Sequence, residues 1–223
     1  MRAHGRFLHL VTALAVGLAT LTQARPAMAH PHVFVDARIG FVIDGNGLLE
    51  AIRVAWRFDP FHTLYILSFD GIAPTPGGGL TAEAQADLAH SYTDWQRGFN
   101  GFAKLTLGGG QIALEAPTEV QAGLRDGQLE ISFTRDLTQP VALTDGAAEV
   151  AVYDATYYHA VSVAAPPDIV GSTNGCNATL SAHQAGTQTA LVQEALSQLE
   201  REASPVIEDV GALLADRITI ACN

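Results

Sequence analysis

The chain has 223 residues, of which 48% are hydrophobic, and its 12 Lys and Arg against 23 Asp and Glu give a formal net charge of −11. This acidic balance argues against a protein that binds a nucleic-acid backbone or an anionic membrane surface, because both partners require basic patches. The length is sufficient for one domain with a sizeable core, or for two small ones.

The first 29 residues have the organisation of a secretory signal. Arg2 and Arg6 form a basic start, residues 7–21 are mostly apolar, and the tripeptide 27–29 (Ala-Met-Ala) is a small-x-small cleavage site. The apolar run is shorter than the about 20 residues of a transmembrane helix, and no second run follows. We therefore expect cleavage before His30 and a periplasmic or secreted protein that does not span the membrane; an uncleaved anchor is the alternative. Cleavage removes three of the 12 basic residues and no acidic residue, so the mature net charge is −14.

The mature chain is expected to open with a β-hairpin. Apolar and polar residues alternate over residues 33–44 and again over 52–59, as in half-buried strands. Residues 45–47 (Gly-Asn-Gly) between them are typical of a tight turn. Antiparallel pairing of these strands brings Asp59, at the end of the second, and the following His62 close to the N-terminus.

Two helices and a series of strands are predicted to follow. Asp59 before Pro60 is typical of an N-cap and a first helical residue, which indicates a short helix to residue 69, and Thr81 caps a second helix to about Arg97. Strands are expected at 103–107, 111–115, 118–124, 128–134, 147–153, 157–164 and 176–182, helices at 188–202 and 205–215, and a last strand at 217–222. The predicted fold is α+β, with mostly antiparallel sheets and three to four helices. We expect one domain over 30–223, with possible sub-units 30–102 and 103–223.

Cys176 and Cys222 are the two cysteines of the chain. Because an exported protein folds under oxidising conditions, we expect them to form a disulfide. A role in a metal site is the alternative, although the pair lacks C-x-x-C spacing. The disulfide would join the last strand to the segment at Cys176 and stabilise the fold by a few kcal/mol, on the order of what chain entropy predicts.

The sharpest chemical feature is His30-Pro31-His32 at the expected mature N-terminus. Cleavage gives His30 a free amine beside its imidazole, and such nitrogen donors suit zinc, copper, nickel and cobalt. Pro31 has no amide proton, which disfavours the square-planar mode that uses deprotonated backbone amides. Asp36 lies on the same side of the strand as His32 but about 13 Å away, so it is the weaker partner. We predict chelation by His30 and His32; an incidental histidine pair is the alternative.

Further ligands must come from elsewhere in the chain. His62 and Asp59 are candidates by the hairpin argument, although a helix-surface histidine and a helix cap explain them equally well. His159 shares strand parity with apolar residues, which is more typical of a core histidine than of a ligand. The sequence contains no H-E-x-x-H, G-x-S-x-G, Walker A or G-x-G-x-x-G motif, so it gives no positive reason to predict an enzyme.

Several motifs together resemble a known family. They are His30-Pro31-His32-Val33-Phe34-Val35-Asp36, Trp56-Arg57-Phe58-Asp59, Val152-Tyr153-Asp154-Ala155-Thr156-Tyr157, Gly175-Cys176 and Ile218-Thr219-Ile220-Ala221-Cys222. In this order they are similar to the domain-of-unknown-function 1007 family, often labelled an uncharacterised ABC-type transport system, periplasmic component. The resemblance implies an exported protein that handles metal beside nickel/cobalt-type or zinc-linked transporters. The residues common in the family correspond to His30, His32, Asp36, Trp56, Asp59, Tyr153 and Asp154.

The chain departs from its relatives in one loop. Relatives often carry an acidic, EF-hand-like loop of the form D-x-D-x-D-G-x-L-x-x-x-E before the helix. Here Leu80 aligns with the Leu of that pattern, and the ligand positions become Ala73, Thr75, Gly77 and Ala84. Because no carboxylate remains at these positions, we expect no calcium there.

These observations together predict a periplasmic accessory protein that binds a divalent transition metal (nickel, cobalt, zinc or copper) and works with an inner-membrane metal transporter. The predicted core ligands are His30 and His32, with His62, Asp59 and Asp154 as candidates to complete the shell. One alternative is a histidine-brace copper protein with oxidative activity, in which His32, His62 or His159 faces His30. The other is a structural or partner-binding protein that uses no metal.

Overall fold

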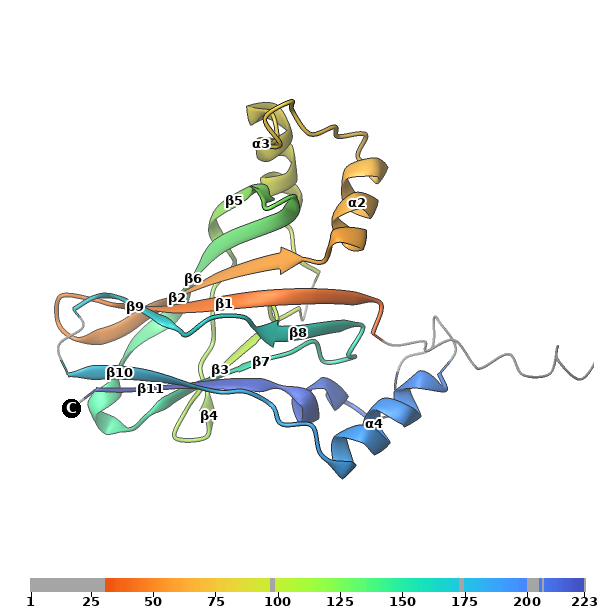
Figure 1. Ribbon diagram of the computed structural model, residues 1–223. Helices are drawn as coiled ribbons and strands as arrows, with labels where there is room; N and C mark the ends of the chain where they lie inside the picture. The colour runs from red at the N-terminus through yellow and green to blue at the C-terminus, as the bar shows by residue number, and fades with distance from the viewer. Residues whose placement is uncertain (1–30, 97–98, 173–174, 200–204, 206, 223) are drawn as a thin grey trace, which may run out of the picture.

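The computed structural model describes residues 31–96, 99–172, 175–199, 205 and 207–222. In this part of the chain two β-sheets, most of whose strands pair antiparallel, are combined with three α-helices (Figure 1). The predicted α+β class is therefore confirmed. No helix among the described residues is long and apolar enough to cross a membrane.

The six-stranded sheet contains the N-terminal hairpin. Its strands are, in spatial order, β5 (Thr118–Arg125), β6 (Gln128–Ala142), β2 (Leu48–Phe58), β1 (Val33–Ile43) and β8 (His159–Val163), and β9 (Asp168–Gly171) also pairs with β1. The predicted hairpin is present: β1 and β2 pair antiparallel, with Val35 opposite Phe58. β8 and β9, by contrast, both pair with β1 in parallel.

The five-stranded sheet is formed by strands between residues 103 and 222. Its order is β10 (Cys176–Ser181), β11 (Asp216–Cys222), β7 (Ala148–Val152), β3 (Ala103–Leu107) and β4 (Gly110–Gln111). β7 and β8 follow one another in the chain but belong to different sheets. The six residues between them therefore carry the chain from one sheet to the other.

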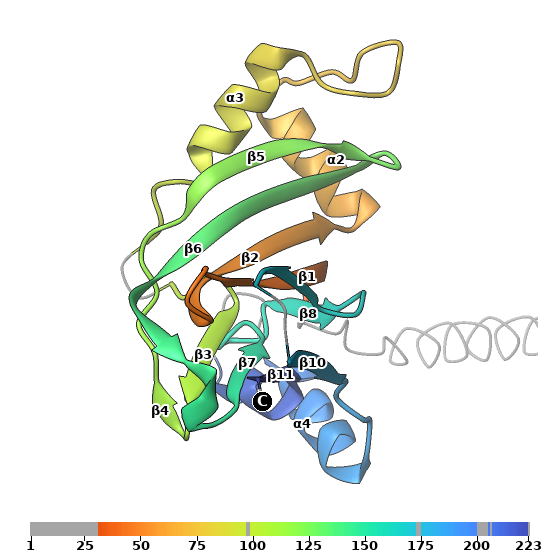
Figure 2. The ribbon, with the colours of Figure 1, turned by 90° about the vertical axis from the view of Figure 1, so that its left-hand side faces the viewer.

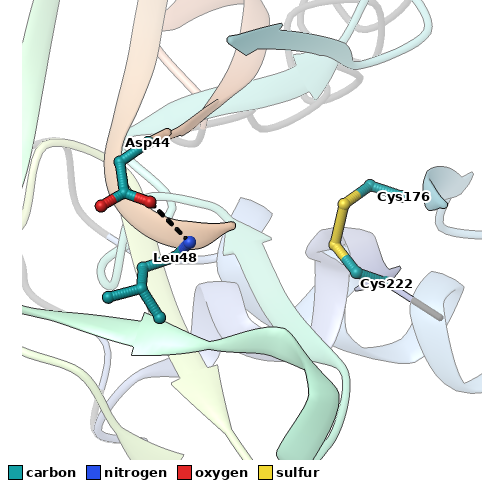
Figure 3. Close-up of a disulfide and its surroundings, with 4 residues drawn as sticks. All are labelled: Asp44, Leu48, Cys176 and Cys222. Atoms are coloured by element: carbon teal, nitrogen blue, oxygen red, sulfur yellow. Dashed lines mark hydrogen bonds between the residues drawn. A yellow bond between two sulfur atoms is a disulfide. The ribbon is translucent and has the colours of Figure 1, made fainter. Parts of the chain in front are cut away.

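The hairpin turn and the disulfide are both held by specific local contacts. Oδ1 of Asp44 accepts a hydrogen bond from the backbone amide of Leu48 at 2.8 Å (Figure 3). The same oxygen accepts the backbone amide of Asn46, also at 2.8 Å. The bond from Leu48 above all holds the pKa of the Asp44 carboxyl below its ordinary value. Cys176 and Cys222 form the predicted disulfide, and they are direct partners in the β10–β11 ladder. The last strand is thus tied to the segment at Cys176.

The larger of the two hydrophobic clusters among the described residues lies between the two sheets and under two of the helices. Alternate residues of the strands point into it, among them Trp56 of β2, Ile131 of β6 and Val150 of β7, all at most 2% exposed. The helices α2 (Pro60–Phe69) and α3 (Ala82–Ser91) cover this core with Leu67 and Leu88. Figures 1 and 2 show both helices at the opposite end of the molecule from α4 (Thr187–Ser197).

Several predicted elements are longer than the observed ones. α3 ends at Ser91 instead of near residue 97, because the chain turns at Tyr92, whose carbonyl accepts a hydrogen bond from Trp95 Nε1 at 2.7 Å. The predicted strand 111–115 is reduced to β4, and Leu114 makes only an isolated bridge to Leu137. Near the C-terminus, α4 and a short 3-10 helix, Val210–Leu214, stand where helices 188–202 and 205–215 are predicted. Residues 200–204 and 206 of these predictions lie outside the described residues.

Candidate functional site

The crossing from β7 to β8 is organised around the carboxylate of Asp154. Its Oδ1 atom accepts hydrogen bonds from the backbone amide and the hydroxyl of Thr156, at 2.9 and 3.0 Å. Its Oδ2 atom accepts the backbone amide of His159 at 3.0 Å and lies 2.6 Å from Nδ1 of the same imidazole. One carboxylate thus fixes both the turn and the orientation of the His159 ring.

The environment of Asp154 keeps this carboxylate ionised. Burial alone raises the pKa of Asp154, but hydrogen bonds from the His159 side chain and from the amides of Thr156 and His159 outweigh it and hold that pKa below its ordinary value. An ionised carboxylate at Nδ1 favours the tautomer of His159 that carries its proton there. The lone pair of the neutral ring then lies on Nε2, which is the nitrogen able to bind a ligand.

His62 is positioned by the start of α2. Asp59 is the N-cap of this helix, as predicted, and its Oδ1 accepts the His62 amide at 2.9 Å. Its Oδ2 accepts the amide of Phe34 at 3.0 Å, so the same carboxylate joins the helix to the beginning of β1. The sequence prediction that Asp59 lies near the start of the first strand is therefore confirmed.

His62 and His159 line one pocket of about 290 Å³. His159 reaches it because β8 pairs in parallel with β1, which sets His159 beside Val33 on the inner face of the sheet. Burial lowers the pKa of His62, and the nearby His159 lowers it further, while the Asp59 carboxylate opposes both effects. His62 is consequently neutral at neutral pH, and the neutral imidazole is the form that binds metal.

His32 and Asp36 lie elsewhere. His32 directly precedes β1 and is not among the residues that line the pocket. Its ring centroid is 4.7 Å from that of Tyr158, and its amide donates to the Tyr158 carbonyl at 2.9 Å. Asp36 forms an ion pair with Arg57, at 3.1 Å between Oδ2 and a guanidinium nitrogen.

The structure brings together a different pair of histidines from the one that the sequence favours. Among the residues that it describes, no group of three or more His, Cys, Asp or Glu side chains is arranged to hold a metal ion. His62 belongs to the predicted ligand set. His159 does not, because its position on the apolar face of the predicted strand indicates a core residue. His30 lies outside the described residues. The ligand roles of His30, His32, His62, Asp59 and Asp154 stay predictions.

One known protein family matches nearly the whole chain. The family model described as "Protein of unknown function (DUF1007)" matches residues 15–222. The chain belongs to the DUF1007 family. No curated protein matches it. Every described residue of the pocket and of the β7–β8 crossing lies inside this DUF1007 match.

Two motif residues of this DUF1007 chain stabilise the surroundings of the pocket. Trp56 is 2% exposed and forms part of the pocket lining. The hydroxyl of Tyr153, next to Asp154, donates to Oδ2 of Asp209 at 2.9 Å. Burial first, and then this bond, raises the pKa of Tyr153 to about 12. The hydroxyl therefore stays protonated and holds the segment at Asp209 against the β7–β8 crossing.

Proposed function

We propose that the mature protein binds a divalent transition metal in the periplasm and exchanges it with an inner-membrane transporter. The observation that carries this proposal is the shared pocket of His62 and His159, with the Nδ1 atom of His159 held by Asp154. A histidine that ligates metal through one nitrogen commonly donates its other N–H to a carboxylate. The pair Asp154–His159 has this arrangement.

The donor set favours nickel, cobalt, zinc or copper. Imidazole nitrogens suit these ions, whereas calcium and magnesium prefer oxygen ligands. Both oxygens of Asp154 already accept two hydrogen bonds each, and both oxygens of Asp59 accept backbone amides. In this proposal Asp154 therefore orients His159 and Asp59 caps α2, while the two imidazoles bind the ion directly.

The mature N-terminus is the proposed source of further ligands. Val33 lies directly beside His159, so the chain enters the sheet next to the pocket. Three residues, His30 to His32, precede Val33 after cleavage, and an extended segment of that length spans about 10 Å. The amine and imidazole of His30 are therefore within reach of an ion at His159.

A transporter partner is supported by the outer side of α2. This helix contains no Asp, Glu, Lys or Arg, although the chain is strongly acidic. Phe61, Leu64, Tyr65 and Phe69 are each between 58% and 80% exposed, while His62 on the same helix faces the pocket. Exposed apolar patches mark interaction surfaces, and a transporter docked on this one would lie beside the proposed metal.

A metal titration of the chain that begins at His30 tests the proposal. We expect zinc, nickel, cobalt or copper to bind and to raise the melting temperature, because a ligand of the folded state alone must stabilise it. His62→Ala and His159→Ala should each weaken binding by about tenfold or more, at least as much as loss of an outer-shell partner. His90→Ala, on the exposed side of α3, is the matched control and should bind as the wild type does. A melting temperature that none of the four ions changes would refute the proposal.

A further inference from the structure

The 3-10 helix Val210–Leu214 lies directly against the β7–β8 crossing, and Gly211 is the residue at the contact. A Cβ added at Gly211 would lie 1.8 Å from the carbonyl oxygen of Asp154 and 2.8 Å from its carbonyl carbon. Both distances are far below the about 3.5–4.0 Å at which non-bonded heavy atoms attract most strongly. Gly211 is not among the glycines with a positive φ. The chain therefore needs glycine here because of the close approach and not because of the backbone conformation.

The carbonyl of Asp154 that meets Gly211 also belongs to the turn that leads to β8. It accepts the backbone amide of Tyr157 at 3.0 Å, and the carboxylate of the same residue accepts the amides of Thr156 and His159. Tyr157 has a φ of 56°, in the left-handed region that bulky residues rarely adopt. The shape of this turn therefore depends on where the backbone of Asp154 is held.

Three more contacts join the segment around Gly211 to the crossing and to β3. The amide of Gly211 donates to the carbonyl of Ala155 at 3.2 Å. The hydroxyl of Tyr153 donates to Oδ2 of Asp209 at 2.9 Å, and Nζ of Lys104 lies 3.6 Å from the same oxygen. The segment is thus fixed against the residues on both sides of the Asp154 carbonyl.

We infer that Gly211 is a positioning residue for His159. Because Gly211 has no side chain, segment 209–211 closes on the backbone of Asp154 and fixes the turn that orients the imidazole. A side chain at this position would displace the carbonyl of Asp154, and the carboxylate that holds Nδ1 of His159 would move with it. The inference rests on the proposed function for what the ring binds, but the state of the ring can be measured in the metal-free chain.

Nitrogen NMR of the imidazole, at a pH at which the ring is neutral, tests the inference. The chemical shifts of Nδ1 and Nε2 report which nitrogen carries the proton, and His159→Gln identifies the signals. In the mature wild type we expect the proton on Nδ1, beside Asp154. Gly211→Ala should give a mixture of both tautomers. Tyr153→Phe removes only the bond to Asp209, so it should fold normally and give a smaller shift in the same direction.

Gly171→Ala is the matched control for a glycine at a close approach. A Cβ at Gly171 would lie 2.0 Å from the carbonyl oxygen of Ile43, at the end of β1 away from His159. Gly171→Ala should lower the melting temperature, as Gly211→Ala does, and leave the tautomer of His159 as in the wild type. The inference is wrong if Gly211→Ala and Tyr153→Phe both keep the wild-type tautomer, or if Gly171→Ala changes it equally.

Zinc titration of the same variants separates the inference from the proposed function. If the wild type binds zinc, Gly211→Ala should bind it about tenfold more weakly or worse, as for the loss of an outer-shell partner. If the wild type binds none of zinc, nickel, cobalt and copper while Gly211→Ala changes the tautomer, the proposed function fails and the inference stands. A changed tautomer with unchanged zinc affinity would likewise support the inference and refute His159 as a ligand.

Discussion

Nδ1 of His159 lies 2.6 Å from Oδ2 of Asp154, and this contact connects the crossing between two sheets with the orientation of a ring in the pocket. The carboxylate is at the start of the crossing and the imidazole at its end. The turn therefore cannot change shape without moving the nitrogen that is available to a ligand. His62 meets the same pocket from α2, which Asp59 joins to the first strand.

Asp154→Asn should weaken metal binding by about 10–100-fold, the usual effect of losing a carboxylate behind a metal-binding histidine. The amide has one acceptor oxygen in place of two, so it cannot accept the hydrogen bonds of both Thr156 and His159, and the orientation of the ring is no longer fixed. Calorimetric titration with zinc or nickel measures the change. Asp216→Asn is a suitable control, because this buried carboxylate also accepts two backbone amides, from Val163 and His183. It should lower stability and leave the affinity unchanged; equal affinities for wild type and Asp154→Asn would contradict the role of Asp154.

The parts of this site that are encoded locally could be predicted, and the non-local parts could not. The hairpin follows from alternation around a Gly-Asn-Gly turn, and the cap at Asp59 from its position before Pro60. The neighbourhood of His159 depends on the parallel pairing of β8 with β1, which are separated by more than 100 residues of sequence. Such pairing leaves no periodic signal near either strand. His159 is thus recognisable as a pocket residue only in the folded chain.

Asp59→Ala should lower the free energy of unfolding by about 0.5–2 kcal/mol, the usual cost of removing an N-cap. Burial raises the pKa of Asp59, but hydrogen bonds from the amides of Phe34 and His62 outweigh it and lower that pKa. A carboxyl whose pKa is lowered by folding stabilises the folded state above its unfolded pKa, and this contribution is lost as the pH falls through the folded value.

Urea unfolding at several pH values measures the role of Asp59. The difference between wild type and Asp59→Ala should be largest near neutral pH and shrink once the pH falls below the ordinary value of 3.8 for this carboxyl. Asp94→Ala, an exposed carboxyl in the turn after α3, is the control and should leave unfolding nearly unchanged. If the difference in unfolding free energy grew as the pH fell, folding would raise the pKa of Asp59 and not lower it, and the prediction would be wrong.

Loss of the disulfide should destabilise the fold more than loss of the cap at Asp59 does. Cys176 and Cys222 are separated by 46 positions. Cross-linking a loop of that size stabilises the folded state by about 4 kcal/mol in the chain-entropy model. The double variant Cys176→Ser, Cys222→Ser should therefore unfold at a lower urea concentration than the oxidised wild type, and a reductant should affect the wild type alone. Identical midpoints for the wild type with and without reductant would refute this prediction.

The proposed role of a free amine at His30 can be tested without changing any described residue. One additional residue before His30 converts the amine into an amide, which no longer offers a lone pair, while the pocket at His62 and His159 is unaltered. If His30 completes the shell, this extension should weaken binding by about tenfold or more, comparable to the loss of another ligand-supporting group. His32→Ala should have a smaller effect, because the His32 ring packs against Tyr158 and is not among the residues that line the pocket. If His32→Ala weakens metal binding more than the extension does, His32 is a ligand. If the extended chain binds the metal as tightly as the unextended chain, the ion is bound by His62 and His159 without the amine.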